Sequence, residues 1–153
     1  MRITIGVDPG ASGGWAIAWG SLDDVSLGAW TGEADFLAEV WSLADSLASE
    51  GLTAVVEHVP PFAGKNIPSS SGFKLGYNAG FICGTFRALQ VPLHLIRPAE
   101  WQKGLPGVRG ATGARKKRLL KDHALRLYPK VDGITLKTAD ALLILHVFLS
   151  TQT

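Results

Sequence analysis

The chain has 153 residues, of which 46% are hydrophobic and 18% are charged, and it contains no low-complexity tract. A chain of this length is expected to form one domain, residues 1–153, that buries roughly two-thirds of its unfolded surface. The single cysteine, Cys83, excludes an internal disulfide framework and fits a reducing compartment, and no uncharged apolar stretch reaches the roughly 18 residues needed to cross a membrane.

The charges are distributed unevenly, although the net charge is only +2. Residues 1–64 contain nine acidic residues and one basic residue, Arg2, whereas residues 97–137 contain eleven Lys or Arg and three acidic residues. A basic surface of this size predicts a polyanionic partner, although a solvated surface helix would give the same pattern.

The first apolar run, residues 3–8, predicts a buried strand that ends at Asp8, because Pro9 and Gly10 cannot extend it. Residues 14–19 predict a second strand that returns antiparallel through a hairpin, and residues 26–30 predict a third. Because the chain begins directly in a strand pattern, no signal peptide is expected. A carboxylate at a strand end beside glycines suits a metal or phosphate site, but Asp8 could equally be a turn residue.

The second carboxylate of interest, Glu57, ends the apolar run of residues 52–57. A helix is predicted before it, from about Glu33 to Ser49, so the run is expected to form a strand parallel to the first. Asp8 and Glu57 would then lie at neighbouring strand ends. Close carboxylates repel each other, and a divalent cation such as Mg²⁺ or Mn²⁺ would neutralise them. The alternative is a chance pair of strand-end acids.

The segment 60–71 predicts a long loop carrying Phe62 and Lys65, with Phe62 either exposed or packed back into the core. A helix capped by Ser71 is expected over residues 72–89. Its glycines recur every fourth residue, at 72, 76, 80 and 84. They predict the close approach of another element, by default the sheet, or else a second subunit's helix or a nucleic-acid backbone. A last strand is expected over residues 91–97.

The C-terminal third is predicted to hold a loop over residues 98–113, a basic helix over 114–128, and an apolar helix that begins at Ala139 after the cap Thr138. Asp140 lies in the first turn of the apolar helix, where the helix dipole favours a carboxylate. It is therefore a third candidate metal ligand.

With these carboxylates in order, the chain resembles the RuvC family of Holliday-junction resolvases, within the RNase H-like nuclease superfamily. Segments 6–10, 56–58 and 139–142 are similar to the three acidic motifs of that family, and segments 62–66 and 73–76 to the loop and helix between two of them. Segment 101–103 and the basic helix are most similar to phage-type members.

The resemblance implies an α/β, RNase H-like fold, in which helices flank a central five-stranded mixed β-sheet. It also implies a homodimer that acts on branched DNA, especially four-way junctions, in the cytoplasm of a bacterial or phage-infected cell. Asp8, Glu57 and Asp140 would hold one or two Mg²⁺ or Mn²⁺ ions. The implied DNA contacts are a stacking side chain and a set of cations: Phe62, Lys65, Lys74, Arg115, Lys116, Lys117, Arg118 and Lys121.

Lys137 departs from the family pattern, because family members usually carry Asp or His three residues before the last Asp. A protonated ammonium cannot ligate a metal and repels a nearby cation. We hypothesise that Lys137 belongs to the catalytic set and steadies a phosphate oxygen. The alternatives are that Asp132 replaces the missing ligand, that activity is weak, or that Lys137 simply faces solvent.

The expected activity is that of a crossover junction endodeoxyribonuclease, which nicks paired phosphodiester bonds by metal-dependent hydrolysis. The alternatives are a nuclease for flaps, branched DNA or RNA, and a non-catalytic junction-binding protein. The Asp-Pro-Gly turn also occurs in sugar-kinase-like ATPases, but that architecture needs two such domains. No nucleotide cofactor and no membrane partner are therefore expected.

Overall fold

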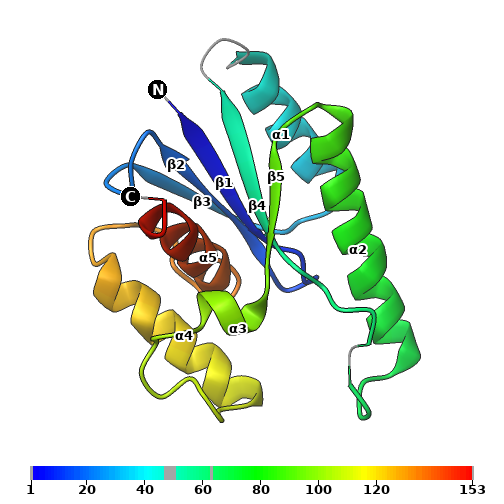
Figure 1. Cartoon of the computed structure of the whole chain (residues 1–153), viewed down its shortest axis with the longest axis vertical. Helices are drawn as coiled ribbons and strands as arrows, with labels where there is room; N and C mark the ends of the chain where they lie inside the picture. Colours follow the sequence, from blue (N-terminus) through cyan, green and yellow to red (C-terminus); the bar gives the residue numbers. More distant parts are fainter. Residues whose placement is uncertain (1, 47–50, 63, 153) are drawn as a thin grey trace.

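The structure is a computed structural model and describes residues 2–46, 51–62 and 64–152. Its strands are β1 (Ile3–Asp8), β2 (Gly14–Trp19), β3 (Val25–Ala29), β4 (Leu52–Glu57) and β5 (Leu93–Ile96). They form one five-stranded sheet in the order β3-β2-β1-β4-β5 (Figure 1). β1 pairs antiparallel with β2 and parallel with β4, so the predicted mixed sheet is confirmed.

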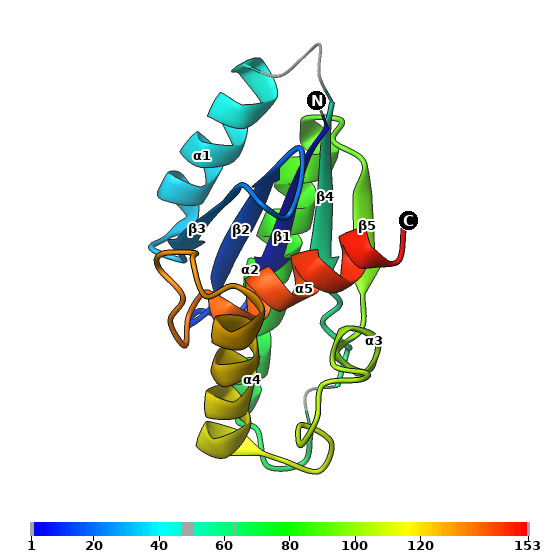
Figure 2. The same ribbon diagram turned by 90° about the vertical axis from the view of Figure 1, so that its left-hand side faces the viewer.

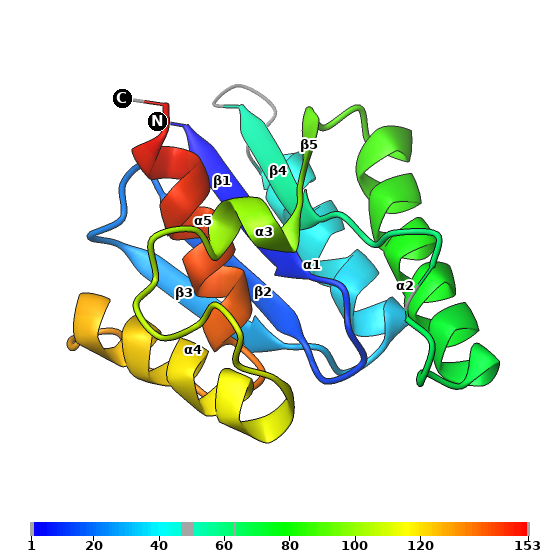
Figure 3. The same cartoon turned by 60° about the horizontal axis from the view of Figure 1, so that its bottom comes forward.

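Helices cover both faces of this sheet (Figure 2, Figure 3). α1 (Glu33–Ser46) and α2 (Ser69–Ala88) pack on one face, with Phe36 and Ile82 against the odd-numbered residues of β1. α5 (Ala139–Ser150) crosses the other face, beside α4 (Gly113–Leu127) and the short α3 (Pro98–Trp101). Because both faces are covered, every residue of β1 is buried.

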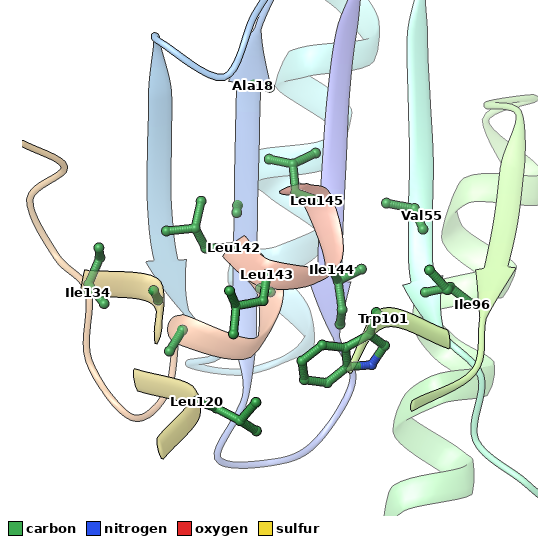
Figure 4. Close-up of a cluster of buried hydrophobic side chains, with 14 of the residues drawn as sticks. Ala18, Val55, Ile96, Trp101, Leu120, Ile134, Leu142, Leu143, Ile144 and Leu145 are labelled. Atoms are coloured by element: carbon green, nitrogen blue, oxygen red, sulfur yellow. The ribbon is translucent and has the colours of Figure 1, made fainter. Parts of the chain in front are cut away.

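The core on the α5 side is built around consecutive apolar residues of that helix, including Leu142, Ile144 and Leu145 (Figure 4). Trp101 of α3 and Leu120 of α4 belong to the same cluster. α5 is buried all along its first half because the sheet lies on one side of it and the other two helices lie beside it.

Gly6 lets α5 approach β1 very closely. A Cβ atom at this position would lie 2.9 Å from the carbonyl oxygen of Ala141 and 2.9 Å from the Cβ of Leu145. Any larger residue would therefore push the helix off the strand. The contact places the first turn of α5 next to the end of β1 and fixes which carboxylates can meet there.

Several predicted boundaries were wrong. α2 begins at Ser69 rather than at residue 72, with Pro68 as its N-cap, so Ser71 lies inside the helix and does not cap it. The predicted loop over residues 98–113 contains α3, which starts at Pro98 because a helix does not use the N–H of its first residue. β5 is shorter than the predicted 91–97, and residues 47–49 of the predicted first helix lie outside the described residues.

The default expectation for the helix glycines was also wrong. Gly76, Gly80 and Gly84 are exposed, and a Cβ added at any of them would meet no atom within 4 Å. The sheet is instead contacted by the opposite side of α2, which buries Ile82 and Phe86. None of the helices in the described part of the chain is long and apolar enough to cross a membrane.

Candidate active site

Asp8, Glu57 and Asp140 line one cleft of about 410 Å³, together with Lys116 and Lys117 of α4. The parallel pairing of β1 with β4 places the first two carboxylates at adjacent strand ends, as the sequence predicted. Asp140 comes from the first turn of α5, next to the close contact at Gly6. The pairing of β1 with β4 and the packing of α5 across β1 therefore bring together three acids that are far apart in the sequence.

Asp8 is held by the turn that follows it. Its Oδ1 accepts a hydrogen bond from the backbone N–H of Gly10 at 3.2 Å, and a Cβ at Gly13 would lie 2.7 Å from its Cγ. The buried side-chain amide of Asn78 donates to the carbonyl oxygen of Pro9 at 2.6 Å, which ties α2 to the same turn. Glycine is required at position 13 because no side chain would fit against the carboxylate.

Lys117 lies between two of the carboxylates. Its Nζ is 3.2 Å from Oδ2 of Asp140 and 4.0 Å from Oδ2 of Asp8. Burial acts against its charge, but the attraction of Asp140 and Asp8 outweighs burial and raises the pKa of Lys117. A single ammonium therefore offsets part of the negative charge of this cleft.

The charged forms of Asp8 and Glu57 are disfavoured by their surroundings. Burial, followed by repulsion from Asp140, raises the pKa of Asp8, and Lys117 only partly opposes this. Burial and the Asp8 carboxylate raise the pKa of Glu57 to about 7, although a hydrogen bond from Trp101 acts in the opposite direction. Raised carboxyl pKa values are expected where several acids lie close together in a buried site, and such a site favours the binding of additional positive charge.

The donor set suits a hard divalent cation. All three side chains offer carboxylate oxygens, which Mg²⁺ and Mn²⁺ prefer. Oδ1 of Asp140 is buried and has no hydrogen-bond partner among the described residues. However, no group of three or more His, Cys, Asp or Glu side chains within the described ranges is arranged to hold a metal ion. The three carboxylates are suitable ligands for a divalent metal, but in this structure the Lys117 ammonium lies between two of them.

A second hollow, of about 720 Å³, begins at Glu57 and runs along α2 past Phe62 and Phe73. The two aromatic side chains are 69% and 72% exposed, so Phe62 does not pack back into the core. Lys65 and Lys74, two of the predicted DNA contacts, are also exposed, but neither lines this hollow. Glu57 lines both hollows, so the exposed aromatic residues are adjacent to the acidic cleft.

The cations of α4 fall into two groups. Arg115, Arg118 and Arg126 are exposed, whereas Lys116, Lys117 and Lys121 are half-buried beside the face that buries Leu120 and Ala124. This helix thus presents basic side chains both at the mouth of the cleft and to solvent.

Lys137 is exposed in the turn before α5, and its backbone N–H donates to Oγ1 of Thr135. Within the described residues, no ion pair joins its ammonium to a carboxylate. Asp132 is exposed as well. The role assigned to Lys137 stays a hypothesis.

No protein-family model and no curated protein matches this sequence. Several solved structures resemble the chain, among them two of RuvC. One is described as T. thermophilus RuvC in complex with Holliday junction substrate, with a TM-score of 0.58 and 16% identity over 99% of this chain and 96% of that one. The other is described as Thermus thermophilus RuvC, with a TM-score of 0.57 and 17% identity over 99% and 97% of the two chains.

The chain has the RuvC fold. At 16% and 17% identity, the likeness covers nearly all of both chains but extends to the fold alone. The RNase H-like architecture predicted from the sequence motifs is therefore confirmed.

Sequence reasoning missed three contacts in the site. Lys117 was assigned to DNA rather than to the carboxylates, although its spacing from Leu120 and Ala124 places it near the inward side of α4. The hydrogen bonds of Trp101 to Glu57 and of Asn78 to Pro9 carry no local sequence signal, because each joins residues distant in the chain.

Proposed function

We propose that this protein is a divalent-metal-dependent endonuclease that resolves four-way DNA junctions by paired nicking. The observation that carries the proposal is the gathering of Asp8, Glu57 and Asp140 in one cleft at the edge of a basic helix, on a RuvC fold. One of the similar structures is a RuvC complex with a Holliday junction substrate, which supports branched DNA as the substrate class. The likeness of segment 101–103 to phage-type members supports a relationship to that subgroup.

Asp8, Glu57 and Asp140 would hold one or two Mg²⁺ or Mn²⁺ ions, which when bound supply an activated water and stabilise charge on the phosphate oxygens. Lys116 and Lys117 line the same cleft and would neutralise the entering phosphate. The exposed ring of Phe62 would stack on an unpaired base beside the cleft. Because many cations of α4 face solvent, binding should weaken steeply as salt is added.

The proposal includes a homodimer, because paired nicks in a four-way junction need two active sites. The exposed face of α1 and α2 supports this assembly. Trp41 and Tyr77 are each 59% exposed, and Gly80 and Gly84 leave a shallow apolar hollow of about 360 Å³ beside Trp41. We expect Gly80→Glu to shift the protein from dimer to monomer in sedimentation equilibrium, and a sedimenting mass that is unchanged by Gly80→Glu would argue against this face.

A second candidate function is junction binding without cleavage. It is favoured by the pairing of Lys117 with Asp8 and Asp140, and by the absence of an arranged metal-binding group in the described residues. Nicking of any branched substrate in Mn²⁺ would exclude it.

The decisive experiment incubates the purified protein with a mobile four-way junction, a flap, a duplex and an RNA–DNA hybrid, each with Mg²⁺ or Mn²⁺. We expect symmetric paired nicks in the junction. Asp8→Asn should abolish cleavage but retain junction binding, whereas Asp24→Asn, which removes an exposed carboxylate in a surface turn, should leave both intact. Cleavage by the Asp8→Asn protein would overturn the proposed site, and preferential cleavage of another substrate would reassign the specificity.

A further inference from the structure

Trp101 is completely buried, and its one polar atom is hydrogen-bonded to a carboxylate of the candidate site. The side chain belongs to the core cluster that contains Ile144 and Leu120 (Figure 4). Its indole Nε1–H donates to Oε2 of Glu57 at 2.7 Å. The hydrogen bond therefore comes from a side chain that the surrounding core holds in place.

The backbone around this contact is also fixed. Glu57 pairs with Ile96 at the end of β4, and the N–H of His58 donates to the Ile96 carbonyl oxygen at 2.8 Å. α3 begins at Pro98, two residues after Ile96, and ends at Trp101. The end of β4, which carries Glu57, is therefore hydrogen-bonded to the end of β5, and β5 leads directly into α3, which carries Trp101.

Glu57 needs such a partner more than the other two carboxylates. Asp8 has a short side chain fixed by the Gly10 N–H, and Asp140 pairs with Lys117. Glutamate has one more rotatable bond than aspartate, so its carboxylate loses more conformational freedom when it is held at one point. The hydrogen bond occupies Oε2, and Oε1 has no hydrogen-bond partner among the described residues, so it is available to the cleft.

We infer that Trp101 is a positioning residue, whose indole N–H fixes the Glu57 carboxylate in the orientation that metal binding requires. The inference rests on the proposed function. Carboxylates that bind metals are themselves usually hydrogen-bonded by neighbouring groups, and loss of such a partner typically costs about 10- to 100-fold in metal affinity or activity. A tryptophan that served only to fill the core would affect folding stability but not metal affinity.

The test compares Trp101→Phe with Trp19→Phe. The control matches the hydrogen bond but not the burial of Trp101, because the half-buried Trp19 donates through Nε1 to Oγ of Ser26 at 2.7 Å, far from the cleft. Mn²⁺ affinity is measured without DNA by electron paramagnetic resonance, and cleavage is then followed as a function of Mn²⁺ concentration. For Trp101→Phe we expect about 10- to 100-fold weaker Mn²⁺ binding, with cleavage recovering as Mn²⁺ is raised. Trp19→Phe should behave as the unmodified protein does.

Two further variants separate positioning from packing. Replacement of Trp101 by β-(3-benzothienyl)alanine keeps the shape of the indole but substitutes sulfur for the N–H, and it should weaken Mn²⁺ binding as Trp101→Phe does. In a Glu57→Gln background, Trp101→Phe should cause no further loss of Mn²⁺ affinity. Junction binding without divalent metal should be unchanged in every Trp101 variant.

The outcomes distinguish the two proposals. If the unmodified protein neither binds Mn²⁺ nor nicks a junction, the proposed nuclease function fails and the role of Trp101 fails with it. If the unmodified protein is active but the benzothienyl variant binds Mn²⁺ equally well, the nuclease stands and Trp101 is only a core residue. An equal loss of Mn²⁺ affinity with and without the Glu57 carboxylate would also overturn the positioning role.

Discussion

Replacing Glu57 by Gln should stabilise the metal-free protein in a pH-dependent way. Gln keeps an oxygen that can accept the Trp101 hydrogen bond, but it removes the charge that burial and Asp8 disfavour. The pKa of Glu57 is raised from 4.5 to about 7 in the folded protein. The folded state therefore holds a proton more tightly than the unfolded state does, and stability falls as the pH rises from about 4.5 to about 7.

The size of the effect follows from the same two values. One pKa unit corresponds to about 1.4 kcal/mol, so a pKa that rises from 4.5 to about 7 costs the protein about 3 kcal/mol once Glu57 is ionised. At pH 8 the substitution should recover up to this amount, which for a domain of this size is a rise of about 6–12 °C in melting temperature. At pH 5 the gain should be below about 1 kcal/mol, because Glu57 is then already protonated in the folded state.

The assay is thermal unfolding in a chelating buffer at pH 5 and pH 8, followed by circular dichroism, for Glu57→Gln and for the exposed control Asp24→Asn. If Glu57→Gln raises the melting temperature equally at both pH values, or lowers it at pH 8, the electrostatic reasoning is refuted. Added Mg²⁺ should then narrow the difference at pH 8, because it should stabilise the unmodified protein, which has three carboxylates in the cleft, more than the variant, which has two.

Three further predictions concern other parts of the site. Gly6→Ala should destabilise the protein by about 1–3 kcal/mol in a urea titration, because the new methyl group meets backbone of α5 that cannot turn aside; an unchanged midpoint would show that the helix shifts freely. Lys117→Met should lower the melting temperature at pH 8, since Asp140 loses its ion-pair partner, whereas the exposed Lys130→Met should not; equal effects of the two would argue against a specific role for the pair. Phe62→Ala should weaken junction binding by about 1–3 kcal/mol in a gel-shift titration, as expected for the loss of one stacked base, and unaltered affinity would remove Phe62 from the interface.

The fold was largely predictable because its signals are local. The strand formed by residues 3–8 is an apolar run ended by Pro9 and Gly10, and the helix before residues 52–57 forces a parallel crossover. Those two facts alone bring Asp8 and Glu57 together. The start of α2 was missed because Pro68 followed by serines predicts a loop as readily as a helix N-terminus.

The site was less predictable, because its details depend on contacts between distant segments. The sequence shows that Lys117 is basic, but only the packing of α4 beside α5 determines that its ammonium faces Asp140. The same holds for Trp101, whose partner lies 44 residues away. Lys137 was assigned to the catalytic set from its spacing to Asp140 alone, and in the structure it is exposed.

The crossing of α5 over β1 at Gly6 has a consequence for how the surrounding chain can vary. Asp140 is placed by direct contact between a helix and a strand. The link from α4 to α5 is anchored at its second half, where Ile134 is buried in the core and Thr138 Oγ1 donates to the Gly133 carbonyl oxygen. Its exposed first half, at Pro129, Lys130 and Asp132, can therefore change in sequence while the separation between Asp8 and Asp140 is preserved, so it is the place to alter what this protein contacts without disturbing its acidic cleft.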